Sequence, residues 1–284
     1  MYDEYDLICV LGPTASGKTK YAVQLARELD GEILSGDSRQ VYRGMDIGTG
    51  KDLADYGDVP YHLIDIVDAG TKYNIYQYQH DFEKAYQDIL SRGKRPILCG
   101  GSGLYLEAAT CGYYLPDVPA DNELRAGLAK LPTEELIAKY ESMRTPHNTT
   151  DYDTRQRLIR ALEIAIYEES HPVTRTSFLP KHTKYLGISV SREVRNARID
   201  ARLKARLDEG MVDEVRKLLD SGIPAEDLLY YGLEYKYLTL YLTGALTYDE
   251  MVEKLRIAIH QFAKRQMTWF RGMERRGIDI EWLT

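Results

Sequence analysis

The segment GPTASGKT, residues 12–19, limits the possible folds more than any other feature of this 284-residue sequence. It matches the pattern G-x-x-x-x-G-K-[ST] at every fixed position. The apolar run 6–12 leads into it, and the stretch from Lys18 to Asp30 that follows has apolar residues at helical spacing. Strand, glycine-rich loop and helix in this order form the context that the pattern requires, so the sequence predicts a phosphate loop (P-loop).

The phosphate loop predicts a ligand that carries a phosphate chain. Its glycines let backbone amides converge on phosphate oxygens at the positive end of the following helix. Lys18 adds a positive charge, and the hydroxyl of Thr19 is a candidate ligand for Mg2+. A nucleoside triphosphate, as in an ATP-binding kinase, and a diphosphate ester both fit this chemistry.

Composition indicates an ordinary globular protein, with 44% hydrophobic and 29% charged residues and a net charge of -7. The three cysteines have no metal-binding spacing, which favours free thiols in a reducing cytosol. No apolar run approaches the roughly 20 residues that span a bilayer. We therefore expect a cytoplasmic monomer with no membrane partner.

The order of predicted elements gives an α/β fold class, a P-loop NTPase-like parallel sheet flanked by helices on both faces. Further strands are predicted at 32–35, 61–67, 95–101 and 184–191. We divide the chain into a P-loop α/β core (1–120), a small helical insertion (121–182), and a return to the core followed by a helical C-terminal region (183–284). Nearly everything after Arg192 is predicted to be helical.

The run SGDSRQVYRGMDIGTGK, residues 35–51, follows the strand 32–35. Its end, GTGK, fails as a second phosphate loop, because the required first glycine is Met45 and the residue after Lys51 is Asp52. Asp37 lies at the carboxyl end of a strand, where open α/β sheets bind ligands. It could hold Mg2+, accept a proton from a nucleophile, or merely cap a turn.

Six segments of the chain occur in the same order in tRNA dimethylallyltransferases, also called tRNA isopentenyltransferases. They are GPTASGKT, DSRQVYRGMDIGTGK, YHLIDIV, GGSGLY, DYDTRQRLIRALEI and AKRQMTWFR. The chain resembles this family from residue 6 to about residue 272. The resemblance implies transfer of a dimethylallyl group from dimethylallyl diphosphate to N6 of the adenosine 3′ of the anticodon in tRNA, with release of pyrophosphate.

The resemblance assigns chemical roles to residues of this chain. It implies that the phosphate loop binds the diphosphate, with Mg2+ as cofactor and Thr19 as its metal ligand. The loop residues concerned are Gly12, Thr14, Ala15, Ser16, Gly17, Lys18 and Thr19. Asp37 is similar to the family's general base, and Ser102 stands where most relatives have threonine, which implies a catalytic polar role near the amine.

The resemblance also implies contacts with the anticodon stem-loop of tRNA. The residues concerned are Asp37, Ser38, Arg39, Gln40, Ser102, Arg125, Gln156, Arg157, Leu158, Ile159 and Arg160. In RIDARLKARLDEG, residues 198–210, Arg198 and Arg202 match family arginines and are assigned to the diphosphate. A solvated charged face is the alternative, because these arginines belong to a regular basic stripe on the predicted helix.

Two features depart from the family pattern. YYGLEYK, residues 230–236, has Leu233 and Glu234 where the family has tyrosine and a basic residue. The helical stretch after Arg125 is also shorter than in typical bacterial members. Both departures predict a change in tRNA choice or affinity rather than in the chemistry, because neither affects the phosphate loop or Asp37.

The C-terminal segment 254–276 contains seven Lys or Arg residues against one Glu. We expect Lys264, Arg265 and Arg271 on exposed faces of a helix, where they could contact phosphates of RNA. Base stacking by Trp269 and Phe270 is possible in principle, but core packing is the favoured interpretation.

Three other functions remain open from the sequence. A small-molecule P-loop kinase would use ATP and release ADP. A non-catalytic RNA-binding P-loop protein would explain the changes at Leu233 and Glu234. An isopentenyltransferase acting on free AMP is disfavoured by the helical insertion and the basic C-terminal segment.

Overall fold

The computed structural model describes residues 2–144, 154–171, 178–180 and 182–284. The chain forms two compact units, one made of residues 1–113 and 178–284 and the other of Tyr114–Ser177. The sequence analysis placed the helical insertion at 121–182 and expected 183–284 to return to the core. The structure groups 178–284 with the P-loop core and gives the helical unit the bounds Tyr114–Ser177.

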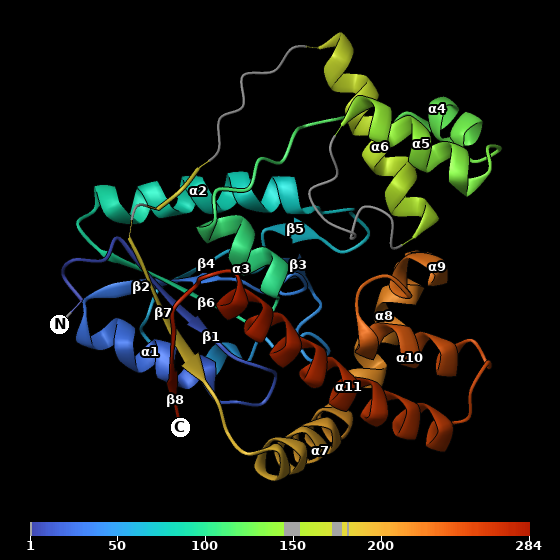
Figure 1. Ribbon diagram of the computed structural model, residues 1–284. Coiled ribbons are helices and arrows are strands. Elements are labelled where there is room, and N and C mark those ends of the chain that lie inside the picture. The colour runs from blue at the N-terminus through green and yellow to red at the C-terminus, as the bar shows by residue number, and fades with distance from the viewer. Residues whose placement is uncertain (1, 145–153, 172–177, 181) are drawn as a thin grey trace. The chain divides into compact units, whose positions relative to one another are not determined.

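A six-stranded parallel sheet in the order β4-β2-β6-β1-β7-β8 forms the centre of the first unit (Figure 1). Its strands are β1 (Leu7–Leu11), β2 (Gly31–Ser35), β4 (Tyr61–His62), β6 (Arg95–Gly100), β7 (Thr183–Ile188) and β8 (Ile280–Leu283). The central strand β1 pairs with β6 on one side and β7 on the other, with Val10 opposite both Cys99 and Leu186. The predicted parallel sheet is confirmed.

Helices cover both faces of this sheet because successive residues of β1 point to opposite sides. Ile8 and Val10 pack with α1 (Lys18–Glu28) in one apolar cluster. Leu7, Cys9 and Leu11 pack in a second cluster with α2 (Ile75–Ser91), α3 (Gly103–Thr110) and the C-terminal helix α11 (Tyr248–Arg275). Both faces of β1 are completely buried, as its uninterrupted apolar run predicts.

Two predictions about strands need correction. The expected strand 61–67 is broken, because Leu63 and Asp65 have φ angles of 65° and 56°, which an extended strand does not allow. Its ends form the two-residue strands β4 and β5 (Val67–Asp68), and β5 pairs with β3 (Tyr42–Arg43) in a separate two-stranded sheet. The C-terminal region also ends in β8, a strand that the expectation of a mostly helical region after Arg192 did not include.

The remaining helices of the first unit follow β7 and pack mainly on one another, with α11 running from them toward the sheet (Figure 1). They are α7 (Arg192–Glu209), α8 (Met211–Asp220), α9 (Ala225–Leu228), α10 (Leu233–Leu242) and α11. Thr247 and Glu250 form a capping box that begins α11, and its face with Leu255, Ile259 and Phe270 is buried in the main core. A short 3-10 helix, η1 (Leu53–Asp55), precedes β4.

The second unit consists of α4 (Asn122–Leu128), α5 (Thr133–Met143) and α6 (Arg155–Ser170). These helices share a core of their own. Its buried members are Leu128, Leu136, Tyr140, Leu158, Leu162 and Ala165. The helical character predicted for this stretch is therefore confirmed for the residues that the structure describes.

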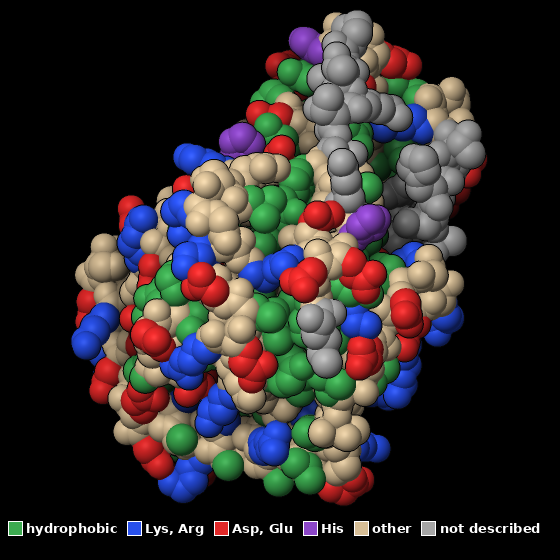
Figure 2. Space-filling model, turned by 90° about the vertical axis from the view of Figure 1, so that its left-hand side faces the viewer, with side chains coloured by type: hydrophobic (Ala, Val, Ile, Leu, Met, Phe, Trp, Pro, Cys, Tyr) green, Lys and Arg blue, Asp and Glu red, His purple; other side chains and the backbone are tan. Residues whose placement is uncertain are grey.

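The surface of the first unit carries many ion pairs between exposed side chains, such as Arg27 with Asp58 and Lys94 with Asp30. Figure 2 shows one face on which acidic and basic side chains are interspersed. In the described part of the chain, every helix is too short or too polar to cross a bilayer.

Candidate active site

The phosphate loop connects β1 to α1 and is fixed by its own backbone. Gly17 caps α1 with a φ of 95°, and Ala15 has a φ of 61°, a left-handed conformation that costs a residue other than glycine about 1–3 kcal/mol. A Cβ atom at Gly12 would lie only 2.6 Å from the carbonyl oxygen of Ile188. The loop thus leads directly into α1, whose first amides have no intrahelical acceptor and can meet a phosphate.

Gln266 of α11 holds the phosphate loop from the far end of the sequence. Its side-chain oxygen accepts a hydrogen bond from the Thr14 amide at 2.8 Å, and its amide nitrogen donates to the carbonyl oxygen of Gly101 at 2.8 Å. The side chain is 7% exposed. Gln266 therefore joins the loop after β1 to the loop after β6, a role that the sequence did not reveal although the segment AKRQMTWFR contains it.

Lys18 and Thr19 lie at the start of α1. The amine of Lys18 donates to the carbonyl oxygen of Pro13 at 3.4 Å. Burial lowers the pKa of Lys18, the charge of Arg202 lowers it further, and the Asp37 carboxylate acts in the opposite direction. Burial raises the pKa of the Cys99 thiol to about 11, against the effects of the Lys18 charge and of a hydrogen bond with Thr19. Lys18, Arg202 and Asp37 thus belong to one electrostatic environment.

The two arginines predicted to bind diphosphate reach the phosphate loop and the segment around Gly50. Arg198 donates to the carbonyl oxygen of Ser16 at 3.4 Å. Arg202 donates to the carboxylate of Asp52 at 2.6 Å and lies 3.4 Å from the carbonyl oxygen of Gly50. The structure therefore brings Arg198 to the loop and Arg202 to the cavity beside it, although α7 is more than 170 residues away in the sequence.

Arg206, one turn further along α7, was not assigned to the site from the sequence. Its side chain is 12% exposed, and its nearest acidic group is Asp52 at 3.5 Å. One guanidinium nitrogen is buried without a hydrogen bond. Burial lowers the pKa of Arg206, and the charge of Arg202 adds to this effect. Arg206 is thus a buried cation whose hydrogen-bonding capacity is not filled by the described residues.

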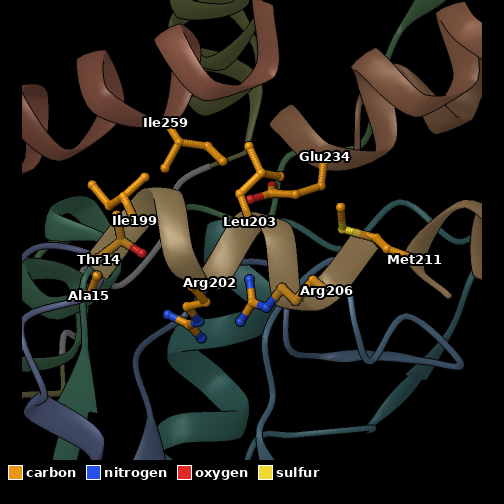
Figure 3. A pocket seen from close by; sticks show the side chains of 9 residues that line it. All are labelled: Thr14, Ala15, Ile199, Arg202, Leu203, Arg206, Met211, Glu234 and Ile259. Carbon is orange, nitrogen blue, oxygen red and sulfur yellow. The ribbon is translucent and has the colours of Figure 1, made fainter. Parts of the chain in front are cut away.

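A cavity lies between part of the phosphate loop and residues of α7, α8, α10 and α11 (Figure 3). Its lining combines apolar and charged side chains. They are Thr14, Ala15, Ile199, Arg202, Leu203, Arg206, Met211, Glu234 and Ile259. Burial raises the pKa of Glu234, while the charges of Arg206 and Arg202 lower it. Glu234 therefore lines this cavity. The sequence analysis had treated it only as a departure from the family pattern.

The segment Asp37–Gln40 follows β2 and is tied to the loop after β6. The amide of Arg39 donates to Oδ1 of Asp37 at 2.8 Å, and the amide of Ser38 donates to Oγ of Ser102 at 3.3 Å. Ser35 donates to Oε1 of Gln40 at 3.0 Å, and Nε2 of Gln40 donates to the carbonyl oxygen of Gly50 at 3.2 Å. Asp37, Ser38 and Ser102 thus meet at one sheet edge, while the Gln40 amide is engaged inside the protein.

Lys51, the last residue of GTGK, has a structural role. Its side chain is 1% exposed and forms ion pairs with Asp46 and Asp65. Its amine also donates to the carbonyl oxygen of Tyr42 at 2.7 Å. This lysine is fully engaged by the protein, in agreement with the sequence argument that GTGK is no phosphate loop.

The predicted tRNA contacts in the second unit have different environments. Arg125 and Arg160 both form ion pairs with Glu163, whose side chain is 1% exposed. Gln156 and Arg157 are exposed and Ile159 is half-buried. Leu158 is completely buried in the core of this unit, so its side chain is absent from the surface. Residues 151–153, at the start of DYDTRQRLIRALEI, lie outside the described residues.

Basic side chains in and just after α11 have different environments. Lys264, Arg265 and Arg271 of α11 are exposed, as expected, whereas Arg276, the residue that caps α11, pairs with the buried Glu107. Phe270 is completely buried, which confirms core packing. Trp269 is 41% exposed, and its indole nitrogen donates to Glu107 at 2.8 Å.

A sequence model described as IPP transferase matches residues 40–273, and a second, described as isopentenyl transferase, matches residues 5–56. The chain belongs to the IPP transferase family. It is 57% identical over 283 residues to tRNA dimethylallyltransferase 1 of Parabacteroides distasonis, covering 98% of this chain and 92% of the relative. It is 58% identical over 281 residues to tRNA dimethylallyltransferase 2 of Porphyromonas gingivalis, covering 98% and 93%.

A solved structure of an IPP transferase supports the same assignment. The full-length tRNA isopentenylpyrophosphate transferase of Bacillus halodurans superposes with a TM-score of 0.71 at 34% identity, covering 98% of this chain and 89% of that one. The resemblance seen in the sequence and the P-loop NTPase-like fold are thereby confirmed. The roles of individual residues remain predictions that rest on the geometry above.

Proposed function

We propose that this member of the IPP transferase family transfers the dimethylallyl group of dimethylallyl diphosphate to N6 of an adenosine in tRNA, the one 3′ of the anticodon. One observation carries the proposal most directly. The phosphate loop with the half-buried Lys18 follows β1, and the Asp37 carboxylate follows β2, at the same end of the parallel sheet, where its charge acts on Lys18. Such a site can bind a diphosphate at one end and accept a proton at the other.

In the proposed reaction, N6 attacks C1 of the dimethylallyl group. The N6–C1 bond forms while the bond between C1 and the diphosphate oxygen breaks, and its electron pair leaves with pyrophosphate. Lys18, the amides of the phosphate loop, Arg198 and Arg202 stabilise the charge that grows on this leaving group. Arg206 lies beside Arg202 and adds to the same field.

Asp37 would remove the proton that N6 loses. The Arg39 amide holds Oδ1 of Asp37 at 2.8 Å, which fixes the direction of the carboxylate and leaves Oδ2 for the substrate. Ser102 accepts from the Ser38 amide at 3.3 Å and so positions the segment that carries Asp37. The adenosine would have to leave its base stack to reach this edge of the sheet.

Mg2+ fits the residues present. Thr19 offers a hydroxyl oxygen at the first turn of α1, and the described residues contain no group of three His, Cys, Asp or Glu side chains that could hold a metal by themselves. Mg2+ commonly takes few protein ligands and completes its shell with phosphate oxygens and water. When bound, it would neutralise part of the diphosphate charge.

The acceptor follows from the family and from exposed cations. The relatives are named for their action on tRNA, and Lys264, Arg265 and Arg271 expose positive charge on α11. Contacts by Arg39, Arg125 and residues 156–160 with the anticodon stem-loop belong to the same proposal, as do the cytoplasmic location and the monomeric state.

Label transfer tests the proposed reaction. Purified protein is incubated with dimethylallyl diphosphate labelled in the dimethylallyl group, Mg2+, and either unmodified tRNA, AMP or ATP. We expect label in tRNA and an equal amount of pyrophosphate. Label in AMP, or formation of ADP from ATP with any small-molecule acceptor, would contradict the proposal.

A variant of Asp37 tests the proton acceptor. Asp37→Ala should fold and bind tRNA like the wild type, because the carboxylate is half-buried and makes one backbone hydrogen bond. Its turnover should fall by about 10²–10⁴-fold, the usual contribution of a positioned base. Full activity of Asp37→Ala would remove this role from Asp37.

A further inference from the structure

The half-buried Arg39, already among the proposed tRNA contacts, stacks on the exposed ring of Tyr230, to which the proposed reaction gives no role. The guanidinium carbon of Arg39 lies 5.0 Å from the centroid of the Tyr230 ring. Tyr230 is 61% exposed and its neighbour Leu229 is 39% exposed. The stack thus presents an exposed aromatic ring beside a half-buried positive charge.

The stack is held at a fixed place relative to Asp37. The Arg39 amide donates to the Asp37 carboxylate at 2.8 Å, so the backbone of Arg39 is held directly beside the candidate proton acceptor. Its side chain lies along the backbone of Gly232, where a Cβ atom would be 3.8 Å from Cγ of Arg39. Gly232 has a φ of 124°, a conformation that disfavours any side chain there.

Tyr231 packs against the ring of Tyr230 from the protein interior. It is 2% exposed, and its hydroxyl accepts from the Gly70 amide at 3.0 Å and donates to the carbonyl oxygen of Thr71 at 2.9 Å. Its ring meets that of Tyr230 edge to face, with centroids 6.1 Å apart. A fully engaged tyrosine therefore anchors the exposed one.

Tyr105 connects the stack with the sheet edge. Burial raises the pKa of its hydroxyl, the Arg39 charge lowers it, and Tyr230 and Asp37 raise it further. The Tyr105 hydroxyl thus lies within the electrostatic influence of Arg39, Tyr230 and Asp37. Tyr105 lies in α3, which begins just after Ser102, the partner of the Ser38 amide.

We propose that the Arg39–Tyr230 stack binds the face of a nucleobase directly next to the target adenosine. This inference rests on the proposed function. When an adenosine leaves a loop, a neighbouring base loses a stacking partner, and aromatic rings and arginine planes are the protein groups that replace it. Stacking accepts any base, so Tyr230 would contribute affinity and position, and the Arg39 charge would also attract the flanking phosphate.

Steady-state kinetics with stem-loop RNAs tests the stack. One RNA is complete, one has an abasic nucleotide 5′ of the target adenosine, and one has it 3′ of the target. Tyr230→Ala should raise KM for the complete RNA about tenfold, the size expected for one lost base stack, and leave kcat within about twofold. Tyr230→Phe keeps the ring and should behave as wild type, and Leu229→Ala serves as the control for an exposed neighbour.

The abasic RNAs show whether Tyr230 contacts a neighbouring base. One of the two should raise the wild-type KM about tenfold and should cause no further rise in Tyr230→Ala. The proposal is overturned if Tyr230→Ala keeps the wild-type KM, or if each abasic RNA affects wild type and Tyr230→Ala by equal factors. An inactive wild type would refute the proposed function instead, which keeps the two failures distinct.

Discussion

Lys18 and Lys51 both follow a glycine in a glycine-rich segment, and their environments are opposite. The Lys51 amine is paired with Asp46 and Asp65 and donates to the Tyr42 carbonyl oxygen. Lys18 reaches the Pro13 carbonyl oxygen at 3.4 Å and has no acidic group within ion-pair distance among the described residues. Their local sequences look alike, but only the segment around Lys18 lies between a core strand and a helix.

The same contrast separates other buried charges of the first unit. Glu32 is engaged by Arg92 and His62, as Lys51 is by its carboxylates. Arg206 is closer to Lys18, since its buried Nη2 has no hydrogen bond and its ion-pair partner at 3.5 Å, Asp52, is already engaged by Arg202 at 2.6 Å. A buried charge is costly unless it is paired, so partners within the chain indicate a structural role and missing partners indicate a site that a ligand completes. Each prediction below tests one side of this distinction.

The largest effect is expected for Lys18→Met. Removing the cation should lower kcat for dimethylallyl transfer by about 10²–10³-fold, because the charge on the leaving pyrophosphate loses a fixed partner. The free energy of unfolding should stay the same or rise, since the variant removes a half-buried charge that has no acidic partner among the described residues. Label transfer and urea unfolding measure the two quantities.

Lys20→Met is the matched control, because Lys20 is exposed two residues further along α1. It should keep wild-type activity and stability. A strongly destabilised Lys18→Met variant would mean that Lys18 is structural, and the contrast with Lys51 would disappear.

Lys51→Met should have the opposite profile. It leaves Asp46 and Asp65 without their cation and the Tyr42 carbonyl oxygen without its donor, so the free energy of unfolding should fall by about 3 kcal/mol. Activity per folded molecule should change less than in Lys18→Met. Lys94→Met removes an exposed ion pair with Asp30 and should cost at most about 0.5 kcal/mol. Equal losses in both variants would refute the structural role of Lys51.

The sequence predicted one side of this contrast better than the other. Local spacing identified the phosphate loop, the parallel sheet and the place of Asp37, because a strand, a loop and a helix follow one another there within a few residues. Spacing also excluded GTGK as a phosphate loop. Spacing could not show that Lys51 forms ion pairs with two carboxylates. One of them, Asp65, lies where the chain adopts left-handed backbone conformations, and these also break the predicted strand 61–67.

Long-range packing decided what the sequence missed. Gln266 touches Thr14 across 252 positions, and Arg206 becomes a site residue only when α7 packs beside the phosphate loop. Both lie in segments whose helical character was predicted, but helical periodicity does not say which distant loop a polar side chain will meet. The strand β8 was missed for the same reason, since its four residues are extended through pairing with β7.

Arg206→Met should weaken ligand binding without lowering stability, and its effect on activity should be smaller than that of Lys18→Met. The substitution keeps an unbranched side chain and removes the buried guanidinium, while Asp52 remains paired with Arg202 at 2.6 Å. We expect KM for dimethylallyl diphosphate to rise about tenfold, the loss of one charged hydrogen bond, with the free energy of unfolding unchanged or higher.

Arg216→Met is the control for Arg206→Met, because Arg216 is an exposed arginine of α8 that pairs with Asp213. It should change neither KM nor stability. If Arg206→Met were less stable than wild type and kept the wild-type KM, Arg206 would have a structural role like that of Lys51.

The smallest effect concerns Glu32 and acid stability. Hydrogen bonds from Arg92, opposed by burial and aided by His62, lower the pKa of Glu32 from 4.5 to about 2. A carboxyl group whose folded-state pKa is depressed stabilises the fold above its unfolded pKa, and this contribution is lost as the pH falls from 4.5 through about 2. Because Arg92 is 42% exposed and water screens it, we expect the free energy of unfolding to fall by about 1 kcal/mol at the acid end.

Urea unfolding of wild type and Glu32→Gln between these pH values measures this loss. The variant should be less stable than wild type at neutral pH and should show a smaller decline on acidification, whereas parallel curves would show that the fold gains nothing from ionising this paired carboxylate.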